Sequence, residues 1–187
     1  MRIIAGVAKG RRLGPVPPGV RPVSDRAREG LFSSLAPEIP GAQVLDLFAG
    51  TGALGIEALS RGAEHAVFVD RSHQAAAAVH ANLATTGLAD RATVVTAEAG
   101  SFLSRADRSH GPFDLALLDP PYELEGAELD AVLRDLATGS LAGDRWTVAL
   151  TRAVKSSTPV IPLDWVVARR LRYGDSLVIL YREVPWA

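Results

Sequence analysis

The sequence of 187 residues contains no cysteine and no long apolar run. Without cysteine there is no disulfide framework, no zinc site with thiolate ligands and no thiol nucleophile, and a reducing compartment fits. The apolar run near the N-terminus covers only residues 3–7, which is too short for the core of a signal peptide. No other run approaches the length of a membrane span. We therefore expect a soluble, cytoplasmic protein without a membrane partner.

Histidine is scarce as well, with four residues in the whole chain. They show neither the spacing of metal ligands nor a partner motif, so we expect no metal site. Each is interpreted as a solvated residue of a helix or a loop: His65, His73, His80 and His110.

The composition is that of an ordinary globular protein, with 48% apolar and 22% charged residues. The charges are unevenly distributed. Residues 1–28 hold seven basic residues and one acidic residue, a net charge of +6, whereas residues 29–187 carry −7. A basic arm on an acidic body indicates a binding surface for phosphates at one end of the chain. The alternative is that these arginines only solvate a flexible tail.

The N-terminal part differs from the rest in its pattern. Two short apolar pieces flank Lys9 and Gly10 and are consistent with a small hairpin, and the prolines of residues 15–22 predict a stiff linker. Ser24 can cap the N-terminus of a following helix. We expect residues 1–22 to form a basic hairpin arm with its linker, and residues 23–187 to form one domain.

From residue 42 onward, apolar strands alternate with helical segments, which is typical of βαβ units on a mostly parallel sheet. At the C-terminus, Gly174 and Asp175 separate two strands that are expected to form an antiparallel hairpin. The predicted fold is α/β and Rossmann-like, with a seven-stranded sheet, helices on both faces and a small N-terminal extension. The expected strands cover residues 44–48, 66–70, 92–96, 113–118, 146–150, 165–173 and 176–182.

A glycine-rich motif joins the first strand to its helix. In the segment LDLFAGTGALGIEAL, Gly50, Gly52 and Gly55 match the pattern G-x-G-x-x-G, and Asp70 ends the next strand 20 positions after Gly50. Glycines let the backbone approach a ligand, and a carboxylate at that distance can bind ribose hydroxyls. The alternative is that the glycines only form a tight turn and that Asp70 is an ordinary residue at a strand end.

The motif fits NAD as well as S-adenosylmethionine. Asp46 lies inside the first strand, where a dinucleotide-binding fold normally keeps apolar residues, and its carboxylate suits the ammonium group of an amino acid. Glu98 and Ala99 follow the third strand, where an adenine edge can be recognised. A dehydrogenase would also need a candidate acid for hydride transfer, which the sequence does not offer. These features favour S-adenosylmethionine.

The fourth strand ends in LLDPPYE. Asp119 is followed by Pro120 and Pro121, which force an extended, non-helical exit and leave bare carbonyl groups beside the carboxylate. Tyr122 adds an aromatic ring at the same strand end. A strand terminator followed by a turn is the alternative explanation, but hydride transfer needs no such segment.

Together, VLDLFAGTGALGIEALSRGA, VFVD and LLDPPY resemble the motifs of class I S-adenosylmethionine-dependent methyltransferases that act on exocyclic amino groups. RIIAGVAKGRRL and RPVSDRAREGLFSSL narrow the resemblance to the bacterial family that methylates N2 of one guanine, guanine 966, in 16S rRNA of the small ribosomal subunit. The resemblance covers residues 2–182. Val23 departs from it, since the family has a threonine there, and we expect no effect on the chemistry.

The resemblance implies a role for each matching residue, with S-adenosylmethionine as cofactor. Residues of the glycine-rich loop would hold its methionine part, Asp70 would bind the ribose, Glu98 and Ala99 would bind the adenine, and Arg71 is a further cofactor-binding residue. The loop residues are Asp46, Phe48, Ala49, Gly50, Thr51 and Gly52. The target base would lie against the catalytic residues Asp119, Pro120, Pro121 and Tyr122. RNA would contact the basic residues of the N-terminal part, which are Arg2, Lys9, Arg11, Arg12, Arg21, Arg26 and Arg28.

The expected partner is 16S rRNA within an assembled or late-assembling small subunit, because so small a domain has little surface for reading RNA sequence, and we expect a monomer. Two alternatives stay open: an N6-adenine methyltransferase of DNA or RNA, and a catalytically silent RNA-binding factor on the same fold. Whether Asp119 acts as a hydrogen-bond acceptor or as a base is open, as is the role of Arg169, Arg170 and Arg172. Because the glycine-rich loop begins after residue 42, deletion of residues 1–20 is expected to leave cofactor affinity nearly intact.

Overall fold

The computed structural model describes residues 1–16, 23–104, 110–121, 123–124, 126–143 and 145–184. Within these ranges, every helix is too short or too polar to cross a membrane. The elements are, in chain order, α1 (Asp25–Ser34), η1 (Ala36–Glu38), β1 (Gln43–Leu47), α2 (Ala53–Ser60), β2 (His65–Asp70), α3 (His73–Thr86), η2 (Ala89–Arg91), β3 (Ala92–Thr96), α4 (Ala99–Leu103), β4 (Leu115–Leu118), α5 (Ala127–Ala137), β5 (Thr147–Ala153), β6 (Trp165–Tyr173) and β7 (Ser176–Glu183).

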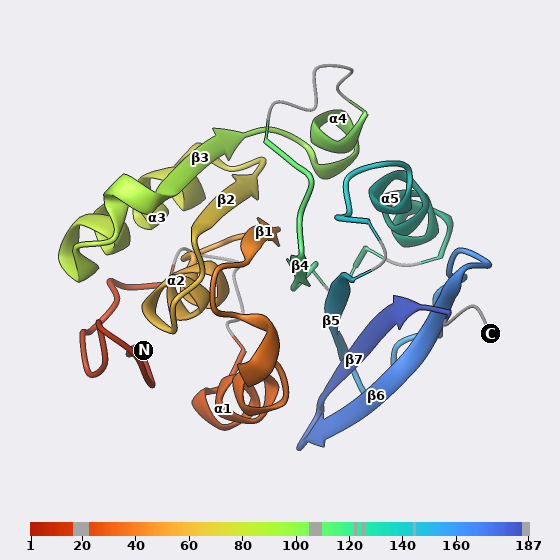
Figure 1. Ribbon diagram of the computed structural model, residues 1–187, viewed down its shortest axis with the longest axis horizontal. Helices are drawn as coiled ribbons and strands as arrows, with labels where there is room; N and C mark the ends of the chain where they lie inside the picture. The colour runs from red at the N-terminus through yellow and green to blue at the C-terminus, as the bar shows by residue number, and fades with distance from the viewer. Residues whose placement is uncertain (17–22, 105–109, 122, 125, 144, 185–187) are drawn as a thin grey trace.

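The strands form a seven-stranded sheet in the order β3-β2-β1-β4-β5-β7-β6 (Figure 1). The strands from β3 to β5 are parallel, and β7 pairs antiparallel with both β5 and β6. The predicted Rossmann-like sheet with a C-terminal antiparallel hairpin is confirmed. The strand order reverses between β1 and β4, and in open α/β sheets ligands bind at the carboxyl ends of the strands on either side of such a reversal.

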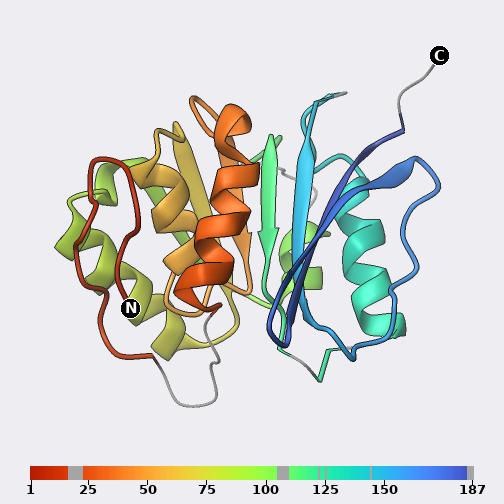
Figure 2. The ribbon, with the colours of Figure 1, turned by 90° about the horizontal axis from the view of Figure 1, so that it is seen from below.

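Helices cover both faces of the sheet (Figures 1 and 2). Alternate residues of β1 point to opposite faces, so Val44 packs with α1, α2 and α3, while Leu45 and Leu47 pack with α4 and α5. Asp46 is the exception in this buried strand, because it places a carboxylate on the α2 face.

α1 begins where the sequence predicts. The hydroxyl of Ser24 accepts a hydrogen bond of 3.2 Å from the backbone N–H of Ala27, which caps the helix. Leu31, Phe32 and Leu35 are buried and fix α1 against the sheet. The helix thereby positions the residues of its first two turns beside the ends of the central strands.

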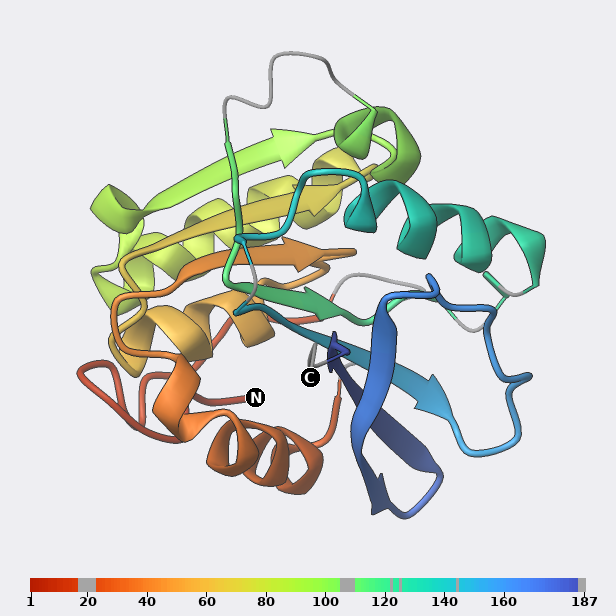
Figure 3. The same cartoon turned by 45° about the vertical axis from the view of Figure 1, so that its right-hand side comes forward.

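The N-terminal segment, residues 1–14, packs against α2 instead of extending from the body (Figure 3). Arg2 and Arg12 form an antiparallel bridge, and the backbone N–H groups of Ile4 and Ala5 donate hydrogen bonds of 2.8 and 3.1 Å to the carboxylate of Glu57. The segment is therefore part of the folded body. Most of the expected linker, residues 17–22, lies outside the described residues.

The C-terminal hairpin turns at Gly174, which has a φ of 59°. A β-bulge between Val167 and Arg169 interrupts the pairing of β6 with β7. After the bulge, Arg170 and Arg172 pair with Ile179 and Leu177 of β7, so they lie on one face of the edge strand.

Candidate active site

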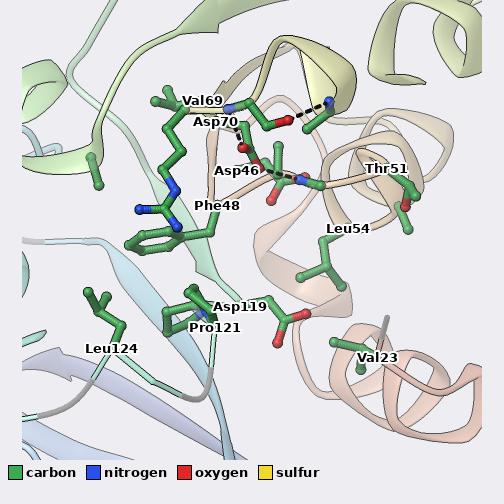
Figure 4. A pocket seen from close by; sticks show the side chains of 18 of the residues that line it. Val23, Asp46, Phe48, Thr51, Leu54, Val69, Asp70, Asp119, Pro121 and Leu124 are labelled. Carbon is green, nitrogen blue, oxygen red and sulfur yellow. Dashed lines mark hydrogen bonds between the residues drawn. The ribbon is translucent and has the colours of Figure 1, made fainter. Parts of the chain in front are cut away.

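A pocket of about 490 Å³ lies at the carboxyl ends of β1, β2, β3 and β4 (Figure 4). Most residues of the candidate site that the structure describes line it. Those from the β1–α2 connection are Asp46, Phe48, Ala49, Gly50 and Thr51. Those from the other strand ends are Asp70, Arg71, Glu98, Ala99, Asp119, Pro120 and Pro121. Tyr122 lies outside the described residues.

The cradle loop, residues 48–52, makes a sharp turn between β1 and α2. Phe48 has a φ of 69°, a left-handed conformation that is unusual for a bulky residue and costs free energy. The backbone N–H groups of Phe48 and Ala49 both donate hydrogen bonds of 3.0 Å to the carbonyl of Val69, which holds the turn in place. Gly50 and Gly52 also have positive φ angles, of 55° and 75°, which explains glycine at both positions.

Gly55 serves packing and does not line the pocket. A Cβ atom at this position would lie 2.3 Å from the ring of Phe68, so only glycine lets α2 approach β2 this closely. Its backbone N–H donates a hydrogen bond of 2.8 Å to the carboxylate of Asp46. Gly52 is also absent from the pocket lining, and it caps the N-terminus of α2 instead.

Asp46 is buried beneath the cradle loop. Burial raises the pKa of its carboxyl to about 8, the Gly55 N–H lowers it, and the charges of Asp119 and Asp70 raise it further. A cationic ligand would favour the ionised form of this group. Asp46 is therefore suited to bind the ammonium group of an amino acid.

Asp70 connects two loops at the other side of the pocket. Its two carboxylate oxygens accept hydrogen bonds of 2.9 Å from the backbone N–H groups of Gly50 and Ser72. Next to it, Arg71 forms an exposed ion pair with Glu98, in which the nitrogen and oxygen atoms are 3.8 Å apart. The structure thus brings together the residues expected to contact ribose and adenine.

Asp119 follows β4 and is partly buried. Burial raises the pKa of its carboxyl to about 7. The pairing of β1 with β4 places Asp119 beside the start of the cradle loop, since Leu47 pairs with Leu118. Figure 4 shows the side chains of Asp46, Asp70 and Asp119 around one pocket.

Some pocket residues are not predictable from the sequence. Leu124 lines the pocket and is held by its backbone carbonyl, which accepts a hydrogen bond of 2.8 Å from Nη1 of Arg152. Leu54 of α2 and Val23 before α1 also line it. The buried side chain of Val23 borders the pocket because α1 packs over the strand ends, and the expectation that this residue has no effect on the chemistry stays a prediction.

The basic residues of the N-terminal part differ in exposure. Five of them are exposed and remain candidates for RNA contact: Arg2, Lys9, Arg11, Arg12 and Arg26. Arg21 lies outside the described residues. Arg28 differs from the expectation of an RNA contact, because α1 buries its side chain completely and directs it to the pocket lining. The net charge of a segment does not show which of its basic residues are exposed and which are buried.

The fold and the pocket define the class of protein. A seven-stranded sheet with this order, a glycine-rich loop after β1 and acidic residues at the ends of β1, β2 and β4 are the features of a class I S-adenosylmethionine-dependent methyltransferase. The cofactor is thus S-adenosylmethionine. Within the described residues there is no group of three or more histidine, cysteine, aspartate or glutamate side chains that could hold a metal ion.

Comparisons with known proteins identify the family. The family described as Conserved hypothetical protein 95 matches residues 1–182. Ribosomal RNA small subunit methyltransferase D of Escherichia coli (strain K12) is 38% identical over 185 residues, which are 98% of this chain and 90% of the relative. The solved structure of the E. coli protein yhhF has a TM-score of 0.85 at 36% identity, and the match covers 98% and 97% of the two chains. The chain belongs to this family, that of ribosomal RNA small subunit methyltransferase D.

A shorter match is to a methyltransferase of another RNA. The tRNA1(Val) (adenine(37)-N6)-methyltransferase of Shewanella putrefaciens is 31% identical over 107 residues, which are 57% of this chain and 44% of that protein.

Proposed function

We propose that the protein transfers a methyl group from S-adenosylmethionine to the exocyclic N2 amine of a guanine in 16S rRNA, guanine 966 of the small ribosomal subunit. The name of the E. coli relative supports small-subunit rRNA as the substrate. The choice of an amine as acceptor rests on the Asp-Pro-Pro segment that follows β4.

The observation that carries this proposal is the position of Asp119 in the same pocket as Asp46. Asp46 offers a carboxylate to the cationic end of the cofactor, and Asp119 offers a second one to the acceptor. The two residues come from neighbouring strand ends, so they flank one cavity. A dehydrogenase has no use for this second carboxylate.

In this proposal, different residues of the pocket bind different parts of the cofactor. S-adenosylmethionine supplies a methyl group on a positively charged sulfur, which is a strong electrophile. Asp46 and the cradle loop bind the methionine part, Asp70 and Arg71 the ribose, and Glu98 with Ala99 the adenine.

At the acceptor, the amine of guanine is a poor nucleophile, because its lone pair is delocalised into the ring. The carboxylate of Asp119 and the carbonyl of Pro120 accept hydrogen bonds from the two N–H groups and stabilise the positive charge that develops on nitrogen. The base must leave its own stack to reach the pocket, and an aromatic residue such as Tyr122 would replace that stack. As the new C–N bond forms and the C–S bond breaks, S-adenosylhomocysteine leaves as a neutral thioether and the amine releases one proton to water.

Residues 23–187 form the methyltransferase domain in this proposal, and residues 1–22 form an RNA-binding extension. The substrate is an assembled or late-assembling small subunit, the protein acts as a monomer, and the reaction takes place in the cytoplasm. Exposed Lys9, Arg11 and Arg12 on the N-terminal segment would contact RNA phosphates.

The test is methyl transfer from labelled cofactor to 16S rRNA and to small subunits that lack the modification, followed by nucleoside analysis. N2-methylguanosine at position 966 is the expected product. N6-methyladenosine would instead support the activity named for the Shewanella relative. Binding of RNA without any methyl transfer would support a catalytically silent factor.

A further inference from the structure

Arg28 lies in the second turn of α1, and its side chain is fully buried. Nη2 donates hydrogen bonds of 2.7 Å to the carbonyl of Arg2 and to the carboxylate of Asp25. Among the described residues, its Nε and Nη1 atoms have no hydrogen-bond partner. A guanidinium carries five N–H donors, so three of them are left unpaired in the interior. Asp25 pairs the charge of the guanidinium, but buried N–H donors without partners are unfavourable and rare in folded proteins.

Arg28 also lines the pocket that holds Asp46 and Asp119. A cationic side chain that borders a binding pocket with unused donors is suited to an anionic group of the ligand. The two hydrogen bonds of Nη2 fix the side chain in this position before any ligand arrives. The buried guanidinium is therefore a preorganised anion site.

The position of Arg28 within the pocket indicates which part of the ligand it meets. Figure 4 shows Asp70 and Val23 at opposite sides of the pocket. The side of Asp70 and Glu98 is the one assigned to ribose and adenine. Val23 and Arg28 lie just before α1 and in its first turns, so they border the other side. Asp119 lies on this side as well, so it is the side where the methionine part of the ligand meets the acceptor.

We propose that Arg28 binds the carboxylate of the methionine part of S-adenosylmethionine. This inference rests on the proposed function. An amino acid presents one ammonium and one carboxylate group, and the pocket offers one buried carboxylate, Asp46, and one buried guanidinium, Arg28. Each of the two side chains is thus opposite in charge to the ligand group that it would meet. Arg28 is then a cofactor-binding residue and not an RNA contact.

An RNA phosphate is a poor fit for the same guanidinium. A phosphodiester is flanked by nucleotides on both sides, whereas the buried side chain of Arg28 can be approached only from the pocket that it lines. The exposed side chains of Lys9, Arg11 and Arg12 are accessible to a phosphate backbone without any rearrangement. A small free ligand that enters the pocket can carry its carboxylate to Arg28.

The test compares two ligands that differ only in this carboxylate, S-adenosylmethionine and decarboxylated S-adenosylmethionine, by isothermal titration calorimetry. We expect the wild-type protein to prefer the first by about tenfold to a hundredfold, as for hydrogen bonds to charged groups. Arg28→Met keeps an unbranched side chain as far as the position of Nε and removes the charged end of the guanidinium. It should lose the preference, while its affinity for the decarboxylated ligand stays close to that of the wild type.

Arg91→Met is the matched control, since Arg91 also donates to backbone carbonyls, of Ala63 and Leu59, but does not line the pocket. It should keep the preference. Equal wild-type affinity for the two ligands would overturn the inference without any variant, so a poorly folding Arg28→Met does not leave it untested. An equal loss of affinity for both ligands in a folded Arg28→Met, or reduced RNA affinity with unchanged cofactor affinity, would also overturn it. Failure of either ligand to bind the wild type would instead overturn the proposed function.

Discussion

The side-chain amide of Asn82 donates a hydrogen bond of 2.8 Å to the backbone carbonyl of Thr51. The carbonyl oxygen of the same side chain accepts a hydrogen bond of 2.7 Å from the backbone N–H of Gly14. One buried residue of α3 therefore connects the cradle loop with the N-terminal segment. The loop that borders the cofactor pocket depends on contacts made by residues far away in the sequence.

Asn82→Ala should lower both stability and cofactor affinity. The substitution leaves the buried carbonyl of Thr51 without this partner, and an unsatisfied buried group costs about 1–3 kcal/mol. Gly14 is exposed, so its N–H can bond to water instead. Urea denaturation should show the lower free energy of unfolding, and calorimetry the weaker binding of S-adenosylmethionine. Thr85→Ala, at an exposed position of the same helix whose hydroxyl bonds only Ala81, is the control. Wild-type behaviour of Asn82→Ala in both measurements would contradict the role assigned to this residue.

Deletion of residues 1–14 should destabilise the whole domain. Glu57 is buried and accepts hydrogen bonds from the backbone N–H groups of Ile4 and Ala5 as well as from Arg61. Loss of two hydrogen bonds to a buried charge costs at least about 3 kcal/mol. The expectation that a deletion of residues 1–20 leaves cofactor affinity nearly intact stays a prediction, and the contacts of the segment with Glu57 add to it a loss of stability. A truncated protein with wild-type melting temperature would show that the segment is an independent arm after all.

Removal of charge without removal of backbone separates RNA binding from folding. The triple variant Lys9→Ser, Arg11→Ser and Arg12→Ser changes only exposed side chains, so the free energy of unfolding should stay within about 0.5 kcal/mol of the wild type. Its affinity for RNA should fall, and the log–log dependence on salt should decrease by roughly 0.7–0.9 per lost phosphate contact. An unchanged salt dependence in a filter-binding assay would show that these residues only solvate the segment.

The fold was predictable because its signals are local. Apolar strands, a helix cap at Ser24 and turn residues at Gly174 each act within a few positions of the chain. The glycine-rich loop is also a local signal, since Gly50 and Gly52 need their positive φ angles wherever the rest of the chain lies. These features determine the carboxyl ends of the strands and thereby most of the pocket.

The remaining features depend on packing between distant segments. Arg26 and Arg28 are the same residue type, two positions apart in α1. The helix nevertheless directs Arg28 toward the pocket and Arg26 toward solvent. The docking of residues 1–14 depends on Glu57, which a sequence pattern shows only as an acidic residue in a helix. No periodicity or spacing relates such pairs, so only the three-dimensional structure reveals them.

S-adenosylmethionine should stabilise the protein against heat, whereas NADH should not. At about 100 times its dissociation constant, a ligand that binds only the folded state adds roughly 2.7 kcal/mol to the free energy of unfolding. Asp46 discriminates between the two ligands, because its carboxylate favours the cationic one. A melting scan in which NADH alone shifts the transition would contradict the proposed cofactor site.

The acidity of Asp119 predicts how stability depends on pH. Burial raises the pKa of this carboxyl to about 7, well above the value of 3.8 that an unperturbed aspartate has. Between about pH 4 and about pH 7 the folded state therefore holds a proton that the unfolded state has lost, and the contribution of Asp119 to stability falls as pH rises. Asp119→Asn stays neutral and should remove this part of the slope. Urea denaturation of both proteins across that range measures the difference.

The same group predicts the pH dependence of methyl transfer. If the carboxylate of Asp119 accepts hydrogen bonds from the guanine amine, the rate should rise as this group ionises, with an apparent pKa near the value of about 7 set by burial. Asp119→Asn keeps an acceptor oxygen without a charge, so it should retain measurable activity and lose this rise with pH. Asp119→Ala should lose most activity and still bind S-adenosylmethionine, because Asp46 and Asp70 are unchanged. Near-total loss of activity in Asp119→Asn would show that the charge or basicity of the carboxylate is needed. Wild-type rates in Asp119→Ala would show that the segment after β4 is only a turn without a catalytic role.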